Sequence, residues 1–187
     1  MPLHGFAPVV FQDSQFLVLG SFPSEASLAE GFYYGHERNH FWPLLAIIAG
    51  TSVPRSIDEK KKLLEKSHIA LWDMVASCER KGSLDQNIRE SELNNIGLLL
   101  ESHHSISRIL LNGRRATELF FRHLIRKGGL LPDIGSMWEW DGLGAKPVLV
   151  FPLPSTSPVP SRQYRHLADK LPFWEQALQG GESFKRG

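Results

Sequence analysis

The residues of this sequence that are best suited to chemistry follow four short apolar runs, each at the point where the run ends. They lie at positions 21–24, 73, 112–113 and 153–160. The hydroxyl and carboxamide groups among them can donate and accept hydrogen bonds. Tyr34 and its neighbour Tyr33 add aromatic surface shortly after the first run. This combination suits a pocket for a planar heterocycle, which stacks on a ring and is hydrogen-bonded at its edges.

Other kinds of site lack their sequence signatures. The chain has no HExxH, GxxxxGK[ST], GxGxxG or GxSxG pattern. His103 and His104 are adjacent, and neighbouring side chains on a helix do not face one site. Pairing Ser155 with His166 would suggest a small α/β hydrolase, but their spacing does not favour it, and a turn hydroxyl is the better interpretation. We therefore expect neither a metal nor a cofactor.

Each candidate residue also has a purely structural interpretation. Tyr34 is equally well explained by core packing, and Asn39 by capping of a helix over residues 41–49. Asp73 and Asp85 fit turn or cap positions better than a role in orienting a pocket. The residue types alone leave these alternatives open.

The elements that must position these residues alternate along the chain. Continuous apolar runs predict strands over residues 16–20, 68–74, 107–112 and 147–152, covered on both faces. Helical periodicity predicts helices over residues 40–49, 57–66, 90–101, 114–126 and 161–178, and residues 128–146 read as a loop with a short β excursion. The prediction is an α/β fold, a three-layer α/β/α arrangement around a mostly parallel four-stranded sheet. Sites in such sheets form beyond the carboxyl ends of the strands.

Length and composition indicate one domain over residues 1–187, with a core from about residue 8 to 179 and a frayed tail. The net charge of +1 means that a nucleic-acid partner would be held by a local basic patch. No apolar run reaches the ~18 residues of a membrane span, and a single cysteine, Cys78, fits a reducing compartment. We expect a monomer in the cytoplasm, at the bacterial nucleoid, or in the nucleus of a eukaryote.

Three segments, taken in order, resemble the uracil-DNA glycosylase superfamily. They are GSFPS…YYGHERNHFW, LLNG with Ala116 following, and LPSTSP. The hypoxanthine-DNA (deoxyinosine) glycosylase branch, often called family six, is the most similar, and LWDMVASCERKGSLDQNI resembles its middle segment. The resemblance runs from about Phe16 to Leu178. It implies a monofunctional enzyme that flips a deaminated base, above all hypoxanthine, out of DNA, hydrolyses its N-glycosidic bond and leaves an abasic site.

The resemblance also assigns roles to residues. Asn39 falls in an Asn-x-Phe-Trp step that the branch is thought to use for catalysis, so it would hold the attacking water. The residues that would bind the base are Gly20, Ser21, Phe22, Tyr34 and Asn112. Of these, Tyr34 would stack on the base. The loop that would contact DNA and act as a wedge contains Pro154, Ser155, Thr156, Ser157 and Pro158. Arg162 would bind the DNA phosphates.

Two positions depart from related branches. Phe22 stands where the mismatch-specific uracil branch has the asparagine of Gly-Ile-Asn-Pro-Gly, and Leu153 stands where the large uracil family has a histidine. Both departures argue against ordinary uracil excision. Alternatives remain: a glycosylase that prefers uracil or xanthine, or a non-catalytic module that binds damaged bases or nucleotides and needs no Asn39.

Overall fold

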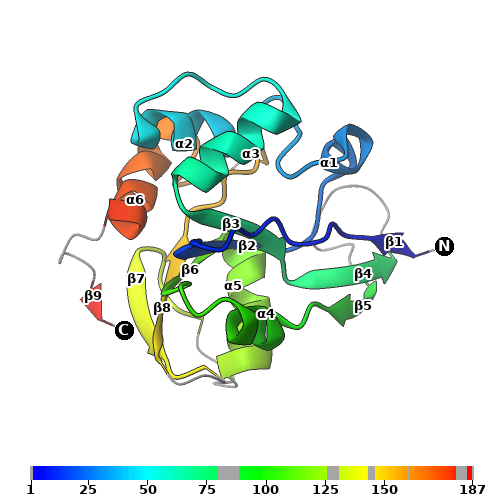
Figure 1. Cartoon of the computed structure of the whole chain (residues 1–187), viewed down its shortest axis with the longest axis vertical. Helices are drawn as coiled ribbons and strands as arrows, with labels where there is room; N and C mark the ends of the chain where they lie inside the picture. Colours follow the sequence, from blue (N-terminus) through cyan, green and yellow to red (C-terminus); the bar gives the residue numbers. More distant parts are fainter. Residues whose placement is uncertain are drawn as a thin grey trace.

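The computed structural model describes residues 2–79, 89–125, 131–142, 146–159, 161–179 and 185–186. Within these ranges the chain folds into three layers, with a mostly parallel sheet between two layers of helices (Figure 1). The predicted α/β/α class is confirmed. Asp85 and Pro160, which belong to segments considered above, lie outside the described residues.

The main sheet has the strand order β3-β2-β6-β8-β7-β9. Its four mutually parallel strands are β3 (Ile69–Asp73), β2 (Phe16–Gly20), β6 (Arg108–Asn112) and β8 (Val148–Leu153). These are the four predicted strands, and every bound lies within one residue of its prediction. The sheet is wider than expected, because β7 (Ser136–Trp140) pairs antiparallel with β8 and the two-residue β9 (Lys185–Arg186) pairs with β7.

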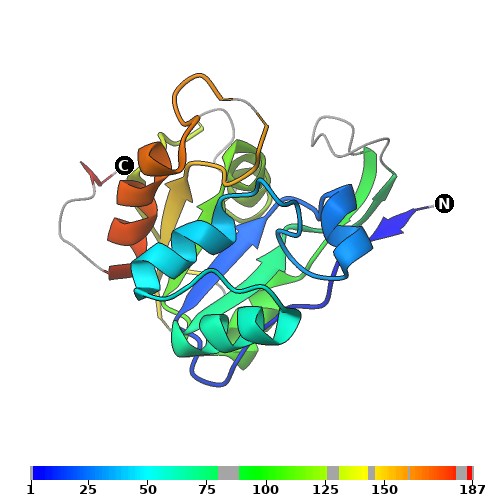
Figure 2. The ribbon, with the colours of Figure 1, turned by 90° about the horizontal axis from the view of Figure 1, so that it is seen from above.

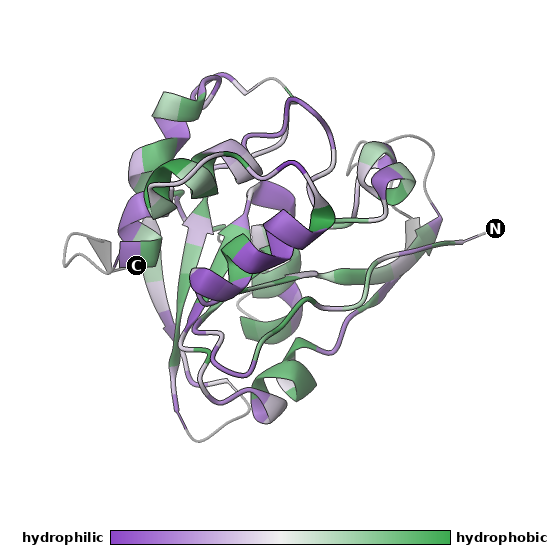
Figure 3. Cartoon of the chain, turned by 45° about the horizontal axis from the view of Figure 1, so that its top comes forward, coloured by the Kyte–Doolittle hydropathy of each residue, from purple (hydrophilic) through white to green (hydrophobic). Residues whose placement is uncertain are grey.

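Two layers of helices bury both faces of this sheet. Helices α2 (Phe41–Ala49), α3 (Ile57–Lys66) and α6 (Leu167–Gln179) cover one face. Helices α4 (Ile96–Ser102) and α5 (Arg114–Phe120), which continues into the π-helical turn η2 (Phe121–Ile125), cover the other (Figure 1). The helices carry both hydrophilic and hydrophobic residues (Figure 3), as amphipathic helices do.

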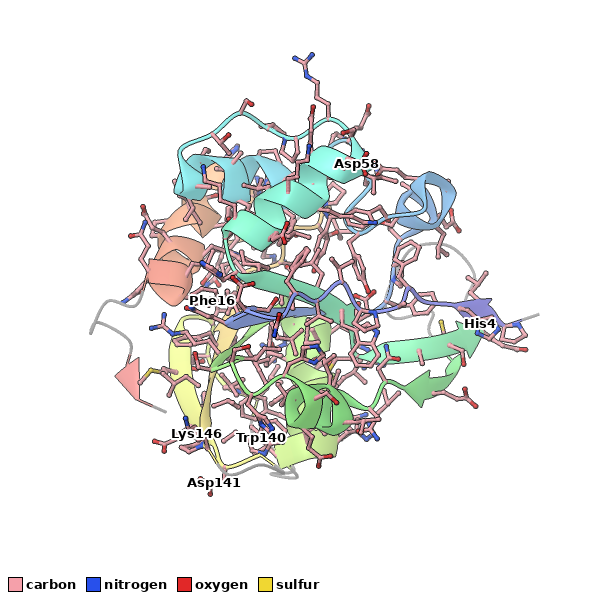
Figure 4. All side chains as sticks on the ribbon, viewed as in Figure 1. His4, Phe16, Asp58, Trp140, Asp141 and Lys146 are labelled. Carbon is pink, nitrogen blue, oxygen red and sulfur yellow. The ribbon has the colours of Figure 1, made fainter. Side chains whose placement is uncertain are left out.

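The strands alternate between the two cores. Leu17 and Leu19 belong to the apolar cluster on the α4 and α5 side, and Val18 belongs to the cluster on the α2, α3 and α6 side. Figure 4 shows side chains filling both spaces, with Asp58 on the outer side of α3. Because both faces are buried, the strands read as uninterrupted apolar runs in the sequence.

A second, smaller sheet replaces part of a predicted helix. Strand β5 (Arg89–Leu93) pairs antiparallel with β4 (Val75–Glu79), and β4 pairs with β1 (Leu3–His4). The following helix α4 begins only after Asn95, whose Oδ1 accepts a hydrogen bond from Leu98 N at 3.0 Å. The prediction of one helix over residues 90–101 is therefore wrong in its first half, because pairing between strands outweighed local helical periodicity.

Two further differences concern helix starts. Helix α1 (Glu25–Glu30) was not predicted; the Ser24 hydroxyl caps it by accepting from Ser27 N at 3.1 Å, and Gly31 ends it with a left-handed φ of 79°. Helix α6 begins at Leu167, six residues after the predicted start.

Among the described helices, none combines the length and hydropathy needed to cross a membrane.

Candidate functional site

The carboxyl ends of the four parallel strands place one residue each in a common row. Gly20 pairs with Asp73, and Asn112 pairs with Leu153. The pairing of Leu19 with Leu111 brings Asn112 level with Gly20 on the adjacent strand. Neighbours in register point to the same side of a sheet, so this row faces the α2, α3 and α6 layer. Figure 2 shows the strands running towards the segments that follow β2 and β8.

Gly20 leaves a gap in the middle of this row. A Cβ at this position would overlap Asp73 Oδ1 and would lie 3.5 Å from the Tyr34 hydroxyl. The missing side chain therefore allows the Asp73 carboxylate and the Tyr34 phenol to converge above the end of β2. Asp73 is only 3% exposed and lines the cavity. A buried carboxylate in this position favours a functional role for Asp73 over the turn or cap role that the sequence favoured.

Tyr34 is held in a conformation that is uncommon for a side chain of its size. Its φ is +55°, and its ring stacks on Phe41 with 4.2 Å between centroids and 30° between planes. The hydroxyl is buried and has no hydrogen-bond partner of ordinary geometry among the described residues. Burial raises its pKa, and the Asp73 charge adds to the rise, while the nearby Asn112 carboxamide opposes it. Tyr34 therefore stays a neutral phenol at the cavity floor, and its stacking on a base remains a prediction.

Asn39 lies in the segment between α1 and α2 and lines the same cavity. Its Oδ1 accepts a hydrogen bond from Phe41 N at 2.9 Å, and its own N–H donates to His36 O at 2.8 Å. His40 occupies the N-cap position of α2 without a side-chain cap bond, so Asn39 supplies the acceptor at this helix start. The interpretation of Asn39 as a capping residue for the helix over residues 41–49 is thus correct in part. An amide oxygen has two lone pairs, so Asn39 can still accept a hydrogen bond from water.

Asn112, at the end of β6, is paired with Thr156 in the loop after β8. Asn112 Nδ2 donates to Thr156 Oγ1 at 2.9 Å, and Thr156 N donates to Asn112 Oδ1 at 2.9 Å. One N–H and one lone pair of the Asn112 carboxamide remain for a ligand. Thr156 is fully buried, so the structure gives it a different environment from the DNA-contacting one expected for this loop.

The other loop residues divide into a fixed base and an exposed rim. Pro154 is buried, and its carbonyl accepts a hydrogen bond from Trp174 Nε1 at 3.1 Å. Ser155 is exposed, while Ser157 is half-buried and its hydroxyl accepts from Val159 N at 3.2 Å. Val159 lines the cavity and is 54% exposed, so an apolar side chain stands at the outer edge of the loop.

These residues enclose one cavity of about 830 Å³, which lies within the usual range for small-molecule sites. Of the predicted site residues only Pro158 is not part of its lining. The lining also contains residues to which the sequence reasoning gave no role: Arg114, Arg115, Glu118, Gln163 and Tyr164. Arg114 and Arg115 closely follow the end of β6, a position from which the sequence could have identified them. Glu118, Gln163 and Tyr164 lie six or more residues beyond a strand end and are brought to the cavity by the fold.

The turn after β2 is held in place by the neighbouring strands. Met74 N donates to Gly20 O at 2.9 Å, and Val75 N donates to Ser21 O at 3.0 Å. Phe22 lines the cavity but is largely buried in the core on the α4 and α5 side. In the part of the chain that the structure describes, no group of three His, Cys, Asp or Glu side chains could hold a metal ion.

Comparisons with known proteins agree on one family. A model of the uracil DNA glycosylase superfamily matches residues 8–178. Two curated proteins named hypoxanthine DNA glycosylase are similar to this chain. The one from Methanosarcina barkeri (strain Fusaro / DSM 804) is 34% identical over 120 residues, which are 63% of this chain and 75% of the relative. The one from Methanosarcina acetivorans is 36% identical over 115 residues, which are 61% of this chain and 73% of the relative.

A solved structure extends the similarity to nearly the whole chain. The NMR structure of a Methanosarcina acetivorans protein, provisionally described as a uracil DNA glycosylase, superposes with a TM-score of 0.72 at 28% identity. The superposition covers 96% of this chain and 98% of that one.

Proposed function

The chain belongs to the uracil DNA glycosylase superfamily, and we propose that this DNA glycosylase acts mainly on hypoxanthine, the base of deoxyinosine. The observation that carries the proposal is the convergence of Asp73 and the Tyr34 hydroxyl above Gly20, with Asn112 level with Gly20 on the adjacent strand, within a cavity of about 830 Å³. A purine fits such a volume. Two relatives named hypoxanthine DNA glycosylase support the same choice.

The floor of the cavity complements the edge that deamination creates. Deamination of adenine turns an accepting ring nitrogen into an N–H donor and replaces the amino group with a carbonyl. In our proposal the Asp73 carboxylate accepts from this N1–H, and backbone amides of Ser21 and Phe22 donate to O6. Adenine would place its N1 lone pair against the Asp73 carboxylate and its amino group against the backbone N–H groups. An acceptor would then face an acceptor and a donor would face donors, which disfavours adenine.

Tyr34 supplies the flat surface for the base. Phe41 covers one face of its ring, and stacking of a base on such an aromatic residue is worth about 1–3 kcal/mol. Because the phenol stays neutral, it adds no charge beside the departing base.

The reaction breaks the bond between C1′ and N9 of the purine, whose electrons leave with the base. The sugar then resembles an oxocarbenium ion, and neutral donors at the base edge stabilise the leaving anion. Asn39 Oδ1 holds the water that adds to C1′, with its orientation set by the hydrogen bond from Phe41 N. An amide is not a base near neutral pH, so bond breaking precedes attack, and the proton of the water passes to solvent or to the free base. No covalent intermediate forms, and the products are the base and an abasic site.

The base must first leave the duplex, at a cost of a few kcal/mol. The exposed apolar side chain of Val159 suits a wedge that fills the vacated space, and Ser155 suits a phosphate contact. Arg162 and the largely exposed Arg114 flank the cavity and would bind the backbone of the DNA.

The test is single-turnover base release from matched duplexes that carry one deoxyinosine, deoxyuridine or deoxyxanthosine, with alkali to reveal abasic sites. We expect the fastest release from deoxyinosine and a loss of at least about 100-fold in Asn39→Ala. Faster release of uracil or xanthine would overturn the substrate assignment but keep the enzyme class. Tight binding without release from any duplex would favour the non-catalytic module.

A further inference from the structure

Thr156, in the loop after β8, is completely buried. Its N–H and hydroxyl are both paired with the Asn112 carboxamide at 2.9 Å. Its carbonyl accepts a hydrogen bond from His40 N, also at 2.9 Å. The main-chain and side-chain polar groups of Thr156 therefore all have partners, and these partners come from the end of β6 and the start of α2.

These hydrogen bonds link Asn112 through Thr156 to His40, and the connection continues from His40 to Asn39. His40 directly follows Asn39, and the Asn39 carboxamide is oriented by its hydrogen bond from Phe41 N. The place of the Asn39 side chain thus depends on the backbone of residues 39–41, and that backbone is tied to the loop through Thr156 O.

The inner part of the same loop is fixed from two other sides. Trp174 Nε1 donates to Pro154 O at 3.1 Å. Gly113 has a φ of +95°, and a Cβ there would lie 2.7 Å from Ser155 Cβ, so only glycine permits this close approach. Ser155 and Val159 nevertheless remain exposed. The loop therefore has outer side chains that can meet DNA and an inner side that contacts the start of α2.

We propose that Thr156 is a positioning residue for Asn39, and that it couples the DNA-facing loop to the water-holding side chain. This inference rests on the proposed role of Asn39. Thr156 touches neither base nor water in this arrangement; its carbonyl holds His40 N, and its pairing with Asn112 fixes the loop in the place from which that carbonyl acts. Removing its hydroxyl leaves an Asn112 N–H without its partner and loosens the loop against α2, and a displacement of about 1 Å at a reacting group can slow a reaction about 100-fold.

The first experiment compares wild type with Thr156→Val and Thr156→Ser on a deoxyinosine duplex at saturating enzyme. We expect Thr156→Val to slow base release about 10- to 100-fold and Thr156→Ser to stay within about threefold of wild type. Binding to the same duplex with hydrolysis-resistant 2′-fluorodeoxyinosine should change by less than about threefold in both variants.

Ser14→Ala is the control. Ser14 is 0% exposed, lies before β2 at the opposite end of the sheet from the cavity, and accepts a hydrogen bond from Phe11 N at 3.0 Å, so this variant loses a buried side-chain hydrogen bond that has no link to Asn39. Its rate should equal that of wild type, whereas an equal slowing in Ser14→Ala and Thr156→Val would overturn the proposal. If Thr156→Val does not fold, Thr156→Ala removes the same hydroxyl without adding volume.

A double variant separates positioning from a general loss of structure. Thr156→Val combined with Asn39→Ala should release the base no more slowly than Asn39→Ala alone, because the first change acts through the second residue. Multiplicative losses, or a wild-type rate in Thr156→Val, would overturn the coupling and leave the glycosylase proposal intact. Absence of base release by wild type would overturn both.

Discussion

The floor of the cavity and the rim of the loop after β8 differ in how their side chains are held. At the floor, Asp73 is 3% exposed and lies against Gly20, and the Asn112 carboxamide is paired at both its ends. At the rim, Ser155 and Val159 are exposed, and Val159 N donates to the turn hydroxyl of Ser157, two residues earlier in the same loop. The first region is built on strands and the second on a loop.

This difference suggests a division of labour. Groups that must recognise a base edge need fixed positions, which strand ends provide. Groups that meet a DNA backbone of any sequence need reach, which an exposed loop provides. We therefore expect changes at the floor to alter the rate and the choice of base, and changes at the rim to alter affinity.

The largest effect in this comparison is expected at the floor. Asp73→Asn keeps the shape but replaces a charged acceptor, and hydrogen bonds to charged groups are worth about 1.5–3 kcal/mol against about 1 kcal/mol for neutral ones. We expect release of hypoxanthine to slow about 10-fold, and its ratio to release of adenine to narrow, because a carboxamide can also donate to adenine N1. The measurement is single-turnover release from deoxyinosine and deoxyadenosine duplexes.

Asp133→Asn is the control, since Asp133 is exposed and does not line the cavity. An Asp73→Asn enzyme that kept the wild-type rate and the wild-type choice of base would show that Asp73 only shapes the floor.

A smaller effect is expected at the rim. Val159→Ser removes the apolar wedge and should weaken binding to a deoxyinosine duplex about fivefold, with a smaller change in the rate at saturating enzyme. Titration of labelled duplex in parallel with single-turnover kinetics checks this. A larger loss in rate than in affinity would end the proposed division between floor and rim.

The smallest effect concerns His40, which lies between the two regions. Burial lowers its pKa below the ordinary 6.5, and the charges of Lys170 and His166 lower it further. Between the folded and unfolded pKa values the unfolded chain binds more protons, so the free energy of unfolding falls as the pH drops below about 6.5. Urea titrations at pH 7.5 and 5.5 measure how much the free energy of unfolding falls between these pH values. We expect a smaller fall for His40→Asn than for wild type; an equal fall would assign the pH dependence to other groups.

The sequence predicted the strands better than the connections. Runs such as Phe16–Gly20 are apolar because both faces are buried, and that cause is visible locally. Helix α3 was also predicted within its observed bounds, Ile57–Lys66, where a Ser56 cap and acidic first turn are local signals. Strand β5 was missed because its partner β4 is not specified by local periodicity.

The site shows the same limit. Roles for Gly20, Asn39, Tyr34 and Asn112 were predicted from the resemblance of their motifs to a known family, and the structure brings these residues to one cavity. The place of Asp73 at the cavity floor depends on the absent side chain of Gly20, more than fifty positions earlier, and the hydrogen-bonded position of Thr156 depends on Asn112. Neither relation leaves a trace in local composition, so only the three-dimensional structure reveals it.

The common register of the strand-end row has a consequence for insertions and deletions. Side chains alternate between the faces of a strand, so one residue added within β6 would turn Asn112 away from Gly20 towards α4 and α5. The same change in the loop beyond Val159 would leave the row intact. Length variation among related chains should therefore be confined to the segments after the strand ends, and the strands themselves should keep their residue count even where their sequences diverge.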